Sequence, residues 1–159
     1  MLTFILFVVR NLLITVHEQR NQSKGQYMNS RFSIVITDKN RNVRNLLRRE
    51  FIAEGYDVLV AENGIELCGF ILSDHTIDLM ILDPNIPYVN YVFINQYIQK
   101  KRPGVPIIMH VFTNDETMNM TISNIKAIIE KKPDLKNLKK TVATILSSMK
   151  KSLAEENKT

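Results

Sequence analysis

Residues 77–87 read IDLMILDPNIP, and this stretch decides the fold. Ile77 to Leu82 is the most continuous apolar run in the organised part of the chain. Such a run is typical of a central parallel strand that is covered on both faces. Asp83 follows it directly, and in open α/β sheets binding sites form at the carboxyl ends of the strands. The stretch therefore predicts both the centre of a sheet and one residue of its site.

Strand-like and helix-like segments alternate on both sides of this stretch. Within residues 40–54, apolar side chains recur at helical spacing, with Arg and Asn on the other face. Residues 113–124 form a polar segment between the fourth and fifth expected strands. The alternation predicts a doubly wound α/β fold with a parallel sheet, helices on both faces and right-handed crossovers. The expected strands are 32–37, 57–61, 77–82, 105–111 and 127–131, and the expected helices are 40–54, 63–71, 92–100 and 134–149.

Composition limits the class of protein. The chain has 159 residues, of which 45% are hydrophobic and 23% charged, so we expect one soluble domain and no disordered or low-complexity protein. The single cysteine, Cys68, excludes an intramolecular disulfide framework and favours a cytoplasmic location. Three scattered histidines argue against a histidine metal centre. The net charge of +5 keeps an acidic partner under consideration.

Residues 1–30 differ from the rest. Residues 1–16 are apolar but too short for a membrane span, with Arg10 near the middle. Two interpretations stay open: an appendage upstream of a start at Met28, or a weak membrane or partner anchor. We expect residues 1–30 to lie outside the fold, residues 31–150 to form the domain, and 151–159 to be a charged, frayed tail.

Charged residues follow several of the expected strands. Because the ends of parallel strands meet at one edge, two carboxylates and a lysine are expected to converge there. Solvent-exposed loop residues are the plain alternative, but their placement at successive strand ends favours a site. The residues are Asp38 and Lys39, Asp83, His110 and Val111, and Lys131 and Lys132.

Five stretches in order resemble the receiver domain of two-component response regulators. They are ITDKNRNVRNLL (36–47), EGYDVLVAENG (54–64), IDLMILDPNIP (77–87), VPIIM (105–109) and EKKPDLKNL (130–138). The resemblance covers Ser33 to Met149, nearly three quarters of the chain. It implies a flavodoxin-like, CheY-like fold with five parallel strands in the order 2-1-3-4-5.

The resemblance also implies roles for individual residues. Asp83 matches the phosphoacceptor aspartate, and Asp38, Asp83 and Asn85 match positions that hold Mg²⁺. Lys131 matches the lysine that contacts the phosphoryl oxygens. A register shifted by one residue gives that role to Lys132, and the sequence leaves both open.

Four positions depart from the family pattern. Lys39 replaces the second acidic residue, so an ammonium stands where Mg²⁺ expects a carboxylate. It is expected either to pair with Asp83 or Asp38, or to extend into solvent. Val111 replaces the signalling Ser or Thr and has no hydroxyl. Ile128 replaces the switching aromatic, and Asn124 stands where the family prefers a glycine before the last strand. The segment between Val111 and Ile128 is shorter than is usual in the family, so the helix there is expected to be short or irregular.

These departures predict a stand-alone, atypical pseudo-receiver that acts through protein–protein contacts, with impaired Mg²⁺ binding and phosphorylation. The alternative is a conventional single-domain response regulator that a histidine kinase phosphorylates on Asp83. At most, the chain would catalyse phosphorylation and dephosphorylation of Asp83 itself. No flavodoxin-like cofactor enzyme is expected, because no phosphate-binding glycine-rich loop follows the first strand.

Partners follow from the same interpretation. A histidine kinase or phosphotransfer protein is expected on the input side. A downstream protein is expected on the face formed by 113–124, 127–131 and the last helix. Nucleic acid is not expected, because no aromatic platform accompanies the basic residues. The expected basic cluster on that face consists of Lys126, Lys132, Lys136, Lys139 and Lys140.

Overall fold

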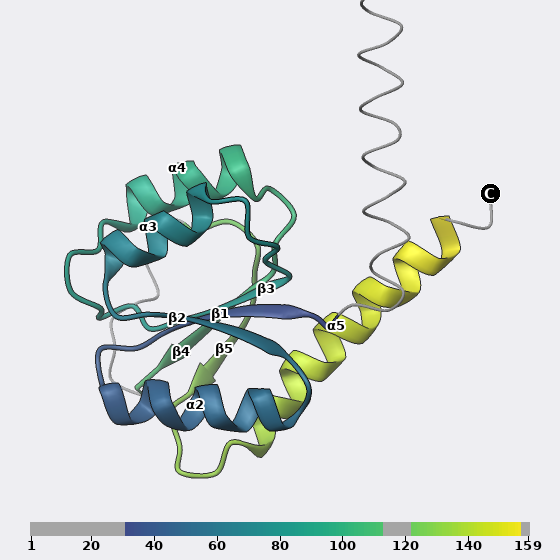
Figure 1. Cartoon of the computed structure of the whole chain (residues 1–159), viewed down its shortest axis with the longest axis horizontal. Coiled ribbons are helices and arrows are strands. Elements are labelled where there is room, and N and C mark those ends of the chain that lie inside the picture. The colour runs from purple at the N-terminus through teal and green to yellow at the C-terminus, as the bar shows by residue number, and fades with distance from the viewer. Residues whose placement is uncertain (1–30, 113–121, 157–159) are drawn as a thin grey trace, which may run out of the picture. The chain divides into compact units, whose positions relative to one another are not determined.

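The computed structural model describes residues 31–112 and 122–156 (Figure 1). Five parallel strands form one sheet in the order β2-β1-β3-β4-β5, which confirms the expected fold class. The strands are β1 (Ser33–Thr37), β2 (Asp57–Ala61), β3 (Leu79–Leu82), β4 (Ile107–Val111) and β5 (Ile125–Glu130). The helices, labelled as in Figure 1, are α2 (Arg41–Ala53), α3 (Gly64–Leu72), α4 (Tyr91–Lys101) and α5 (Lys136–Glu156).

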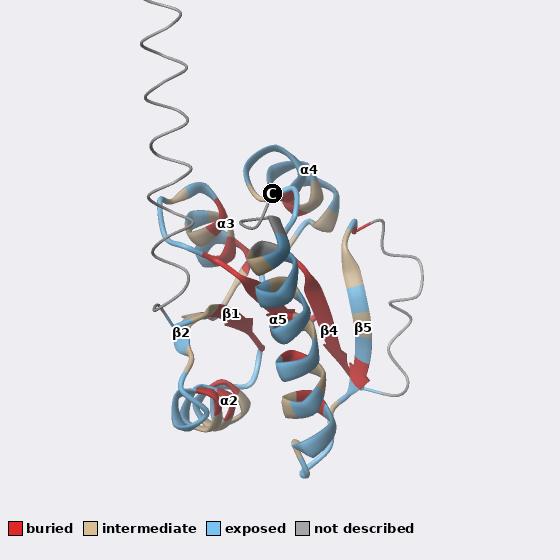
Figure 2. Cartoon of the chain, turned by 90° about the vertical axis from the view of Figure 1, so that its right-hand side faces the viewer, coloured by how far each residue is buried: buried red, intermediate tan, exposed pale blue. Residues whose placement is uncertain are grey.

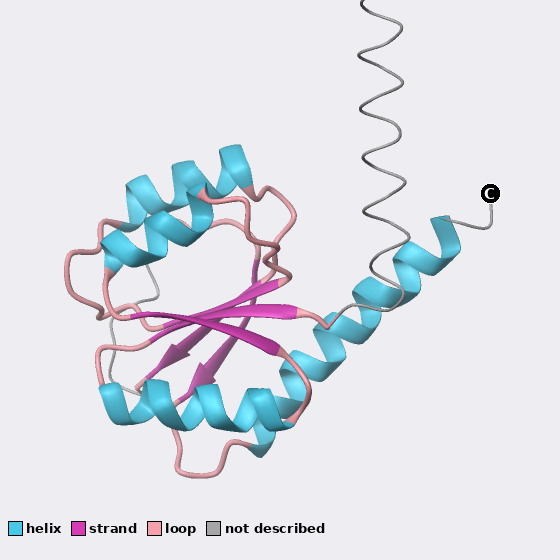
Figure 3. Cartoon of the chain, in the orientation of Figure 1, coloured by secondary structure: helices cyan, strands magenta, loops and turns pink. Residues whose placement is uncertain are grey.

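Helices cover both faces of the sheet (Figure 3). Alternate strand residues point to opposite faces, so Met80 and Leu82 pack toward α3 and α4 while Leu79 and Ile81 pack toward α2 and α5. β3 and β4 are buried along their whole length. Along the edge strand β5, exposed residues alternate with residues that are partly or fully buried (Figure 2). The continuous apolar run therefore lies at the centre of the sheet, as predicted.

Three helices begin on an asparagine side chain. Asn40 accepts a hydrogen bond from the amide of Asn42 at the start of α2. Asn63 and Asn90 each accept two such bonds, at the starts of α3 and α4. These side chains satisfy amide groups that have no partner within the first helical turn. Each cap fixes where the chain turns from a strand end into the covering helix.

Two residues that tolerate the left-handed backbone conformation adopt it. Gly55 has φ 91° after α2, and Asn124 has φ 65° just before β5. Asn124 thus adopts the left-handed conformation for which the family uses glycine. Tyr88, in the loop after β3, has φ 54°, which the sequence did not suggest.

The structure corrects several expected boundaries. β5 begins at Ile125 rather than 127, because Ile125 already pairs with Ile107 of β4. α5 continues to Glu156, so residues 151–156 extend the last helix and are not a frayed tail. Arg44 of α2 is buried rather than on a solvated face. The helix expected within 113–124 falls mainly on 113–121, outside the described residues.

The lysines of the expected basic cluster do not all face the same surface. Lys139 turns to α2, where its Nζ lies 2.8 Å from Glu50 and 3.1 Å from Glu54.

None of the helices in the described part of the chain is long and apolar enough to cross a membrane. The anchor suggested for residues 1–16 lies outside the described part, and the boundary at residue 31 stays a prediction.

Candidate functional site

Two buried carboxylates lie side by side at the carboxyl edge of the sheet. Asp38 follows β1 and Asp83 follows β3, and these strands are neighbours, with Ile36 paired to Ile81. The relative exposure is 1% for Asp38 and 0% for Asp83. The pairing of β1 with β3 therefore brings together two residues that are 45 positions apart in the sequence.

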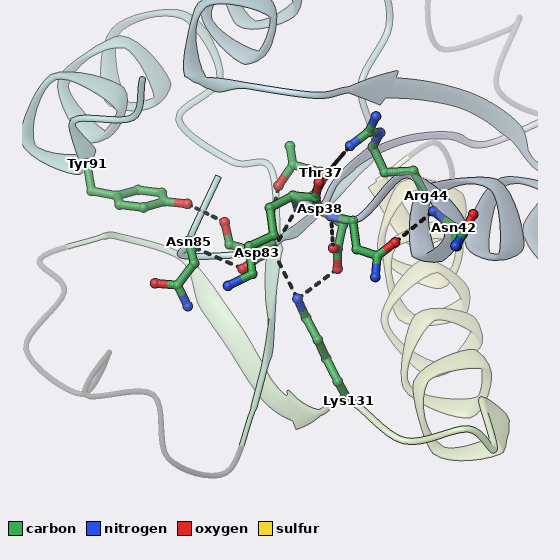
Figure 4. A network of polar contacts seen from close by, with 10 residues as sticks. Thr37, Asp38, Asn42, Arg44, Asp83, Asn85, Tyr91 and Lys131 are labelled. Carbon is green, nitrogen blue, oxygen red and sulfur yellow. Dashed lines mark hydrogen bonds and ion pairs between the residues drawn. The ribbon is translucent and has the colours of Figure 1, made fainter. Parts of the chain in front are cut away.

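Lys131 bridges the two carboxylates (Figure 4). Its Nζ lies 2.7 Å from Oδ2 of Asp38 and 3.0 Å from Oδ2 of Asp83, with 6% of the side chain exposed. Lys132, the alternative from the sequence, points to the surface and pairs with Glu130 at 2.7 Å. The geometry thus brings Lys131, and not Lys132, to the two aspartates.

Backbone amides also donate hydrogen bonds to the two carboxylates. The amide of Asn40 donates to Oδ1 of Asp38 at 2.7 Å. The amides of Lys39 and Asn85 donate to Oδ2 and Oδ1 of Asp83 at 3.0 and 2.9 Å. Burial alone would raise the pKa of Asp83, but these two amides and the Lys131 ammonium outweigh it and lower the pKa. Asp83 is therefore ionised at neutral pH.

Lys39 contributes its backbone rather than its side chain. The residue is exposed, and its ammonium makes no ion pair with any residue in the described ranges. Of the two arrangements expected for Lys39, the structure has the one that extends into solvent. The neutralising contact with Asp83 comes instead from Lys131.

Arg44 holds the loop that carries these amides. Its Nη1 donates to the carbonyl oxygens of Asp38 at 2.8 Å and Lys39 at 3.2 Å. Its Nη2 pairs with Glu62 at 2.8 Å, at the end of β2. A planar guanidinium with several donors can hold two carbonyl groups and a carboxylate at once. Arg44 thereby ties the loop 38–40 to α2, on which Arg44 lies, and to the end of β2, where Glu62 lies.

The main chain of Asp83 is fixed on two sides. Its amide donates to Oγ1 of Thr37 at 3.0 Å, and its carbonyl accepts from the Tyr91 hydroxyl at 2.7 Å. Burial raises the pKa of Tyr91 far above its usual value, with a further contribution from the Asp83 charge, so the hydroxyl keeps its proton and remains a donor. These two contacts hold in place the main chain from which the Asp83 side chain extends.

Val111 and Ile128, the two departures from the family pattern on β4 and β5, differ in burial. Val111 is buried at the end of β4, and its carbonyl accepts the amide of Lys131 at 2.6 Å. Ile128 is 53% exposed on the edge strand. Phe112, after Val111, places its ring centroid 4.9 Å from the Lys131 ammonium, a cation–π contact. The site therefore has an aromatic ring beside the lysine and a valine at the expected hydroxyl position.

Sequence reasoning missed Thr37, Arg44, Tyr91 and Phe112. Arg44 looked like one of several arginines on a polar helix face, and only the packing of α2 shows that it turns inward. Tyr91 begins α4, and nothing in its local sequence marks it as a partner of Asp83. No local signal distinguishes these residues, because their partners come from distant parts of the chain.

The match to known families agrees with this geometry. A family model for the response regulator receiver domain matches residues 34–143. The chain belongs to this family. Receiver domains are modules of two-component signalling, so a signalling role follows for this receiver domain at the level of the family.

Two curated relatives resemble the receiver domain in part of their length. The probable transcriptional regulator ycf27 of Cyanidium caldarium is 34% identical over 91 residues, which is 57% of this chain and 34% of the relative. The aerobic respiration control protein ArcA of Escherichia coli K12 is 37% identical over 68 residues, 43% of this chain and 28% of ArcA. The receiver domain thus spans about a third of the length of these relatives.

Solved structures support the same fold. The response regulator TrrA of Thermotoga maritima, in complex with Mg²⁺-BeF, is 27% identical with a TM-score of 0.62, covering 72% of this chain and 98% of TrrA. TrrA in complex with the histidine kinase ThkA matches at 28% identity and the same TM-score of 0.62, over 72% of this chain and 98% of that chain. The chemotaxis protein CheY4 of Vibrio cholerae, 18% identical with a TM-score of 0.62 over 73% of this chain and 99% of its own, shares the fold.

Proposed function

We propose that this receiver domain is atypical, with weak Mg²⁺ binding and inefficient phosphorylation of Asp83, and that it signals through protein–protein contacts. One observation carries the proposal. Every carboxylate oxygen of Asp38 and Asp83 already contacts an amide or the Lys131 ammonium of the chain itself. A metal ion would have to compete with these contacts for its ligands.

The donor set fits Mg²⁺ poorly. Mg²⁺ prefers near-octahedral oxygen ligation at short distances and relies on carboxylates to offset its charge. Here Asp38 and Asp83 supply two carboxylates, Lys131 cancels one of their charges, and Lys39 takes the position of a third acid. The backbone carbonyl of Asn85, an exposed residue, would add one neutral oxygen. This balance supports weak metal binding.

The conventional function is the second candidate, and one observation favours it. Asp83 is ionised, buried and 3.0 Å from a lysine ammonium, an arrangement suited to a carboxylate nucleophile. In that reaction a carboxylate oxygen of Asp83 forms a bond to phosphorus while the donor's phosphorus–nitrogen bond breaks and the donor imidazole takes up a proton. The complex of TrrA with the kinase ThkA supports a histidine kinase or phosphotransfer protein as partner.

Phosphorylation by a small donor separates the two candidates. The protein is incubated with acetyl phosphate and Mg²⁺, and its intact mass is measured. We expect no stoichiometric phosphoryl adduct on the wild-type chain. A stoichiometric adduct that disappears in Asp83→Asn would overturn the atypical function and establish the conventional one.

Charge exchange at Lys39 tests whether its positive charge weakens Mg²⁺ binding. Lys39→Asp is expected to tighten Mg²⁺ binding at least tenfold, because it supplies the missing carboxylate and removes a repelling charge. Arg41→Asp is the matched control, since Arg41 is an exposed residue two positions further along with the same charge change. Equal Mg²⁺ affinities for the two variants would show that Lys39 does not limit metal binding.

The proposed downstream surface consists of β5 and the start of α5. Lys126 and Lys140 are exposed there, whereas Lys132 and Lys136 pair with Glu130 and Asp134. An acidic protein is the partner that this surface would bind. In-cell crosslinking of lysines is expected to join Lys126 or Lys140 to another protein. Crosslinks to another protein that come from Lys100 and Lys101 of α4 alone would contradict this surface.

A further inference from the structure

Five exposed apolar side chains belong to α3, α4 and the loop between β3 and α4. They are Ile65, Leu72, Tyr88, Phe93 and Tyr97, which are between 39% and 81% exposed. The two helices pack against each other on the face of the sheet that α2 and α5 do not cover (Figure 1). None of the five belongs to the carboxylate cluster, so the receiver chemistry gives these side chains no role.

Phe93 and Tyr97 lie on the side of α4 that borders α3. Asn95 marks the other side of α4, because its Oδ1 accepts a hydrogen bond at 2.9 Å from the amide of Ser123, just before β5. α3 and β5 lie on opposite sides of α4 (Figure 2). Phe93 and Tyr97 are each two residues from Asn95, which places them nearly halfway round the helix from it. Both residues therefore lie on the α3 side of α4.

Ile65 and Leu72 lie on the side of α3 that borders α4. The two helices run in the same direction, since each connects two parallel strands. Ile65 and Leu72 each directly follow a residue that α3 buries, just as Asn95 directly follows a buried residue of α4. They therefore point to the same side as Asn95 does, and for α3 that is the side of α4. Tyr88 joins them, because its carbonyl oxygen lies against Gly64 at the start of α3. The five side chains thus form one surface, the α3–α4 face.

The α3–α4 face is large enough for a protein interface. A phenylalanine or tyrosine side chain has roughly 150–250 Å² to bury, so the three aromatic residues alone expose roughly 350 Å². Apolar patches above a few hundred Å² are uncommon on monomers and mark interaction sites. A standard interface buries roughly 800 Å² per partner, a little more than half of it apolar. The face therefore supplies most of the apolar area that such an interface needs.

Charges of opposite sign lie at two corners of this face. Glu66 is exposed in the first turn of α3, and Lys100 and Lys101 are exposed in the last turn of α4. Arg102, bound to carbonyl oxygens at the end of α3, adds a third positive charge, so the basic corner outweighs the nearby Asp74. Because α3 and α4 run in the same direction, the acidic and basic corners are diagonally opposite. A two-fold axis between two copies exchanges such corners, which makes the face complementary to itself.

We propose that the α3–α4 face binds a second copy of this chain in a two-fold dimer. Phe93 and Tyr97 of each copy pack against the α3–α4 face of the other. Lys100 and Lys101 of each copy lie beside Glu66 of the other. The dimer uses no residue of the proposed downstream surface, and it requires neither Mg²⁺ nor phosphorylation.

Sedimentation velocity of the full-length chain over a range of concentrations tests the dimer. The wild-type chain is expected to show a reversible equilibrium between monomer and dimer. Phe93→Glu is expected to raise the dimer dissociation constant at least tenfold, because buried aromatic anchors carry much of the energy of an interface. Ile128→Glu is the matched control and should dimerise as the wild type does. Ile128 of β5 is 53% exposed against 57% for Phe93, and it lies outside the face.

Salt tests the charge pairing. Added salt screens charge pairs at a protein surface, so it is expected to raise the dissociation constant of the wild-type dimer several-fold. Lys100→Gln combined with Lys101→Gln removes these pairs, and the dissociation constant of this variant should change less with salt. An equal response to salt in both proteins would overturn the two-fold arrangement.

Three further outcomes would overturn the proposal. A chain that stays monomeric at every concentration places no second copy on this face. A dimer that Phe93→Glu leaves intact, or that Ile128→Glu dissociates equally, is held by another surface. A monomer that sediments with vesicles of phosphatidylcholine and phosphatidylserine, but not as Phe93→Glu, would assign the face to a membrane surface. Circular dichroism checks that each variant is folded, and Ile65→Glu repeats the test from α3.

Discussion

The ammonium of Lys131 lies 2.7 Å from Oδ2 of Asp38, and both side chains are almost completely buried. The same ammonium contacts Asp83 at 3.0 Å, so one lysine from the end of the sheet's edge strand neutralises carboxylates from two central strands. Charges buried this deeply are tolerated only when they are paired and hydrogen-bonded. The stability of the domain and the chemistry of its site therefore depend on the same contact.

Lys131→Met is expected to destabilise the domain by about 3–5 kcal/mol at pH 7, because it leaves two buried carboxylates without their cation. The destabilisation should become smaller as the pH falls, because protonation of Asp83 removes one of the buried negative charges. Urea unfolding at pH 7 and at lower pH measures both effects. Lys132→Met, which breaks only the exposed pair with Glu130, should change stability by less than about 1 kcal/mol. Similar losses in both variants would contradict the assignment of Lys131.

Acidification is expected to destabilise the domain through His110. The pKa of His110 falls from its ordinary 6.5 to about 4 in the folded protein. The unfolded chain therefore binds a proton between these values that the folded chain excludes. The contribution of His110 is complete above pH 6.5 and is lost as the pH falls toward 4, by up to about 3 kcal/mol.

Chemical denaturation across this pH range measures how steeply the free energy of unfolding depends on pH. His110→Phe should flatten the pH dependence between 6.5 and 4, whatever its effect on stability at pH 7. His75→Phe should keep the wild-type slope, because His75 is exposed. An unchanged slope in His110→Phe would mean that another group binds the proton.

Arg44→Met is expected to loosen the loop that carries Lys39 and Asn40. The variant removes both bonds to backbone carbonyls and should cost about 2–3 kcal/mol, since bonds to charged groups are the stronger ones. Hydrogen exchange of the Lys39 amide should accelerate beyond this global loss. Glu62→Gln is the control, because Glu62 is 61% exposed and its pairing contributes little. Equal protection of the Lys39 amide in both variants would show that Arg44 does not hold the loop.

Two glycines of α3 should respond in opposite directions to alanine. A Cβ on Gly64 would lie 2.2 Å from the carbonyl oxygen of Tyr88, so Gly64→Ala must displace the loop after β3 and should cost about 1–3 kcal/mol. Gly69 has open space at its Cβ position within the helix, and Gly69→Ala should stabilise by about 0.5–1 kcal/mol. Thermal unfolding of both variants gives the comparison. A stabilised Gly64→Ala would contradict the close approach of α3 to this loop.

Much of the fold follows from local pattern. The apolar run 77–82 predicts a strand buried on both faces, and β3 lies at the centre of the sheet. Asn124 is predicted to tolerate a left-handed conformation, and it has φ 65°. Element boundaries do not follow from local pattern alone, because the start of β5 depends on pairing with β4 rather than on its own residues.

The sequence by itself determined the order of strands and helices, the presence of Asp38, Asp83 and a lysine at strand ends, and the lysine in place of a second acid. Only the tertiary structure decided between Lys131 and Lys132, turned Lys39 into solvent and Arg44 inward, and left Nδ1 of His110 without a partner. The reason is physical. Periodicity and local propensity act over a few residues, whereas the partners of a buried charge or polar atom come from strands that meet only when the sheet has formed.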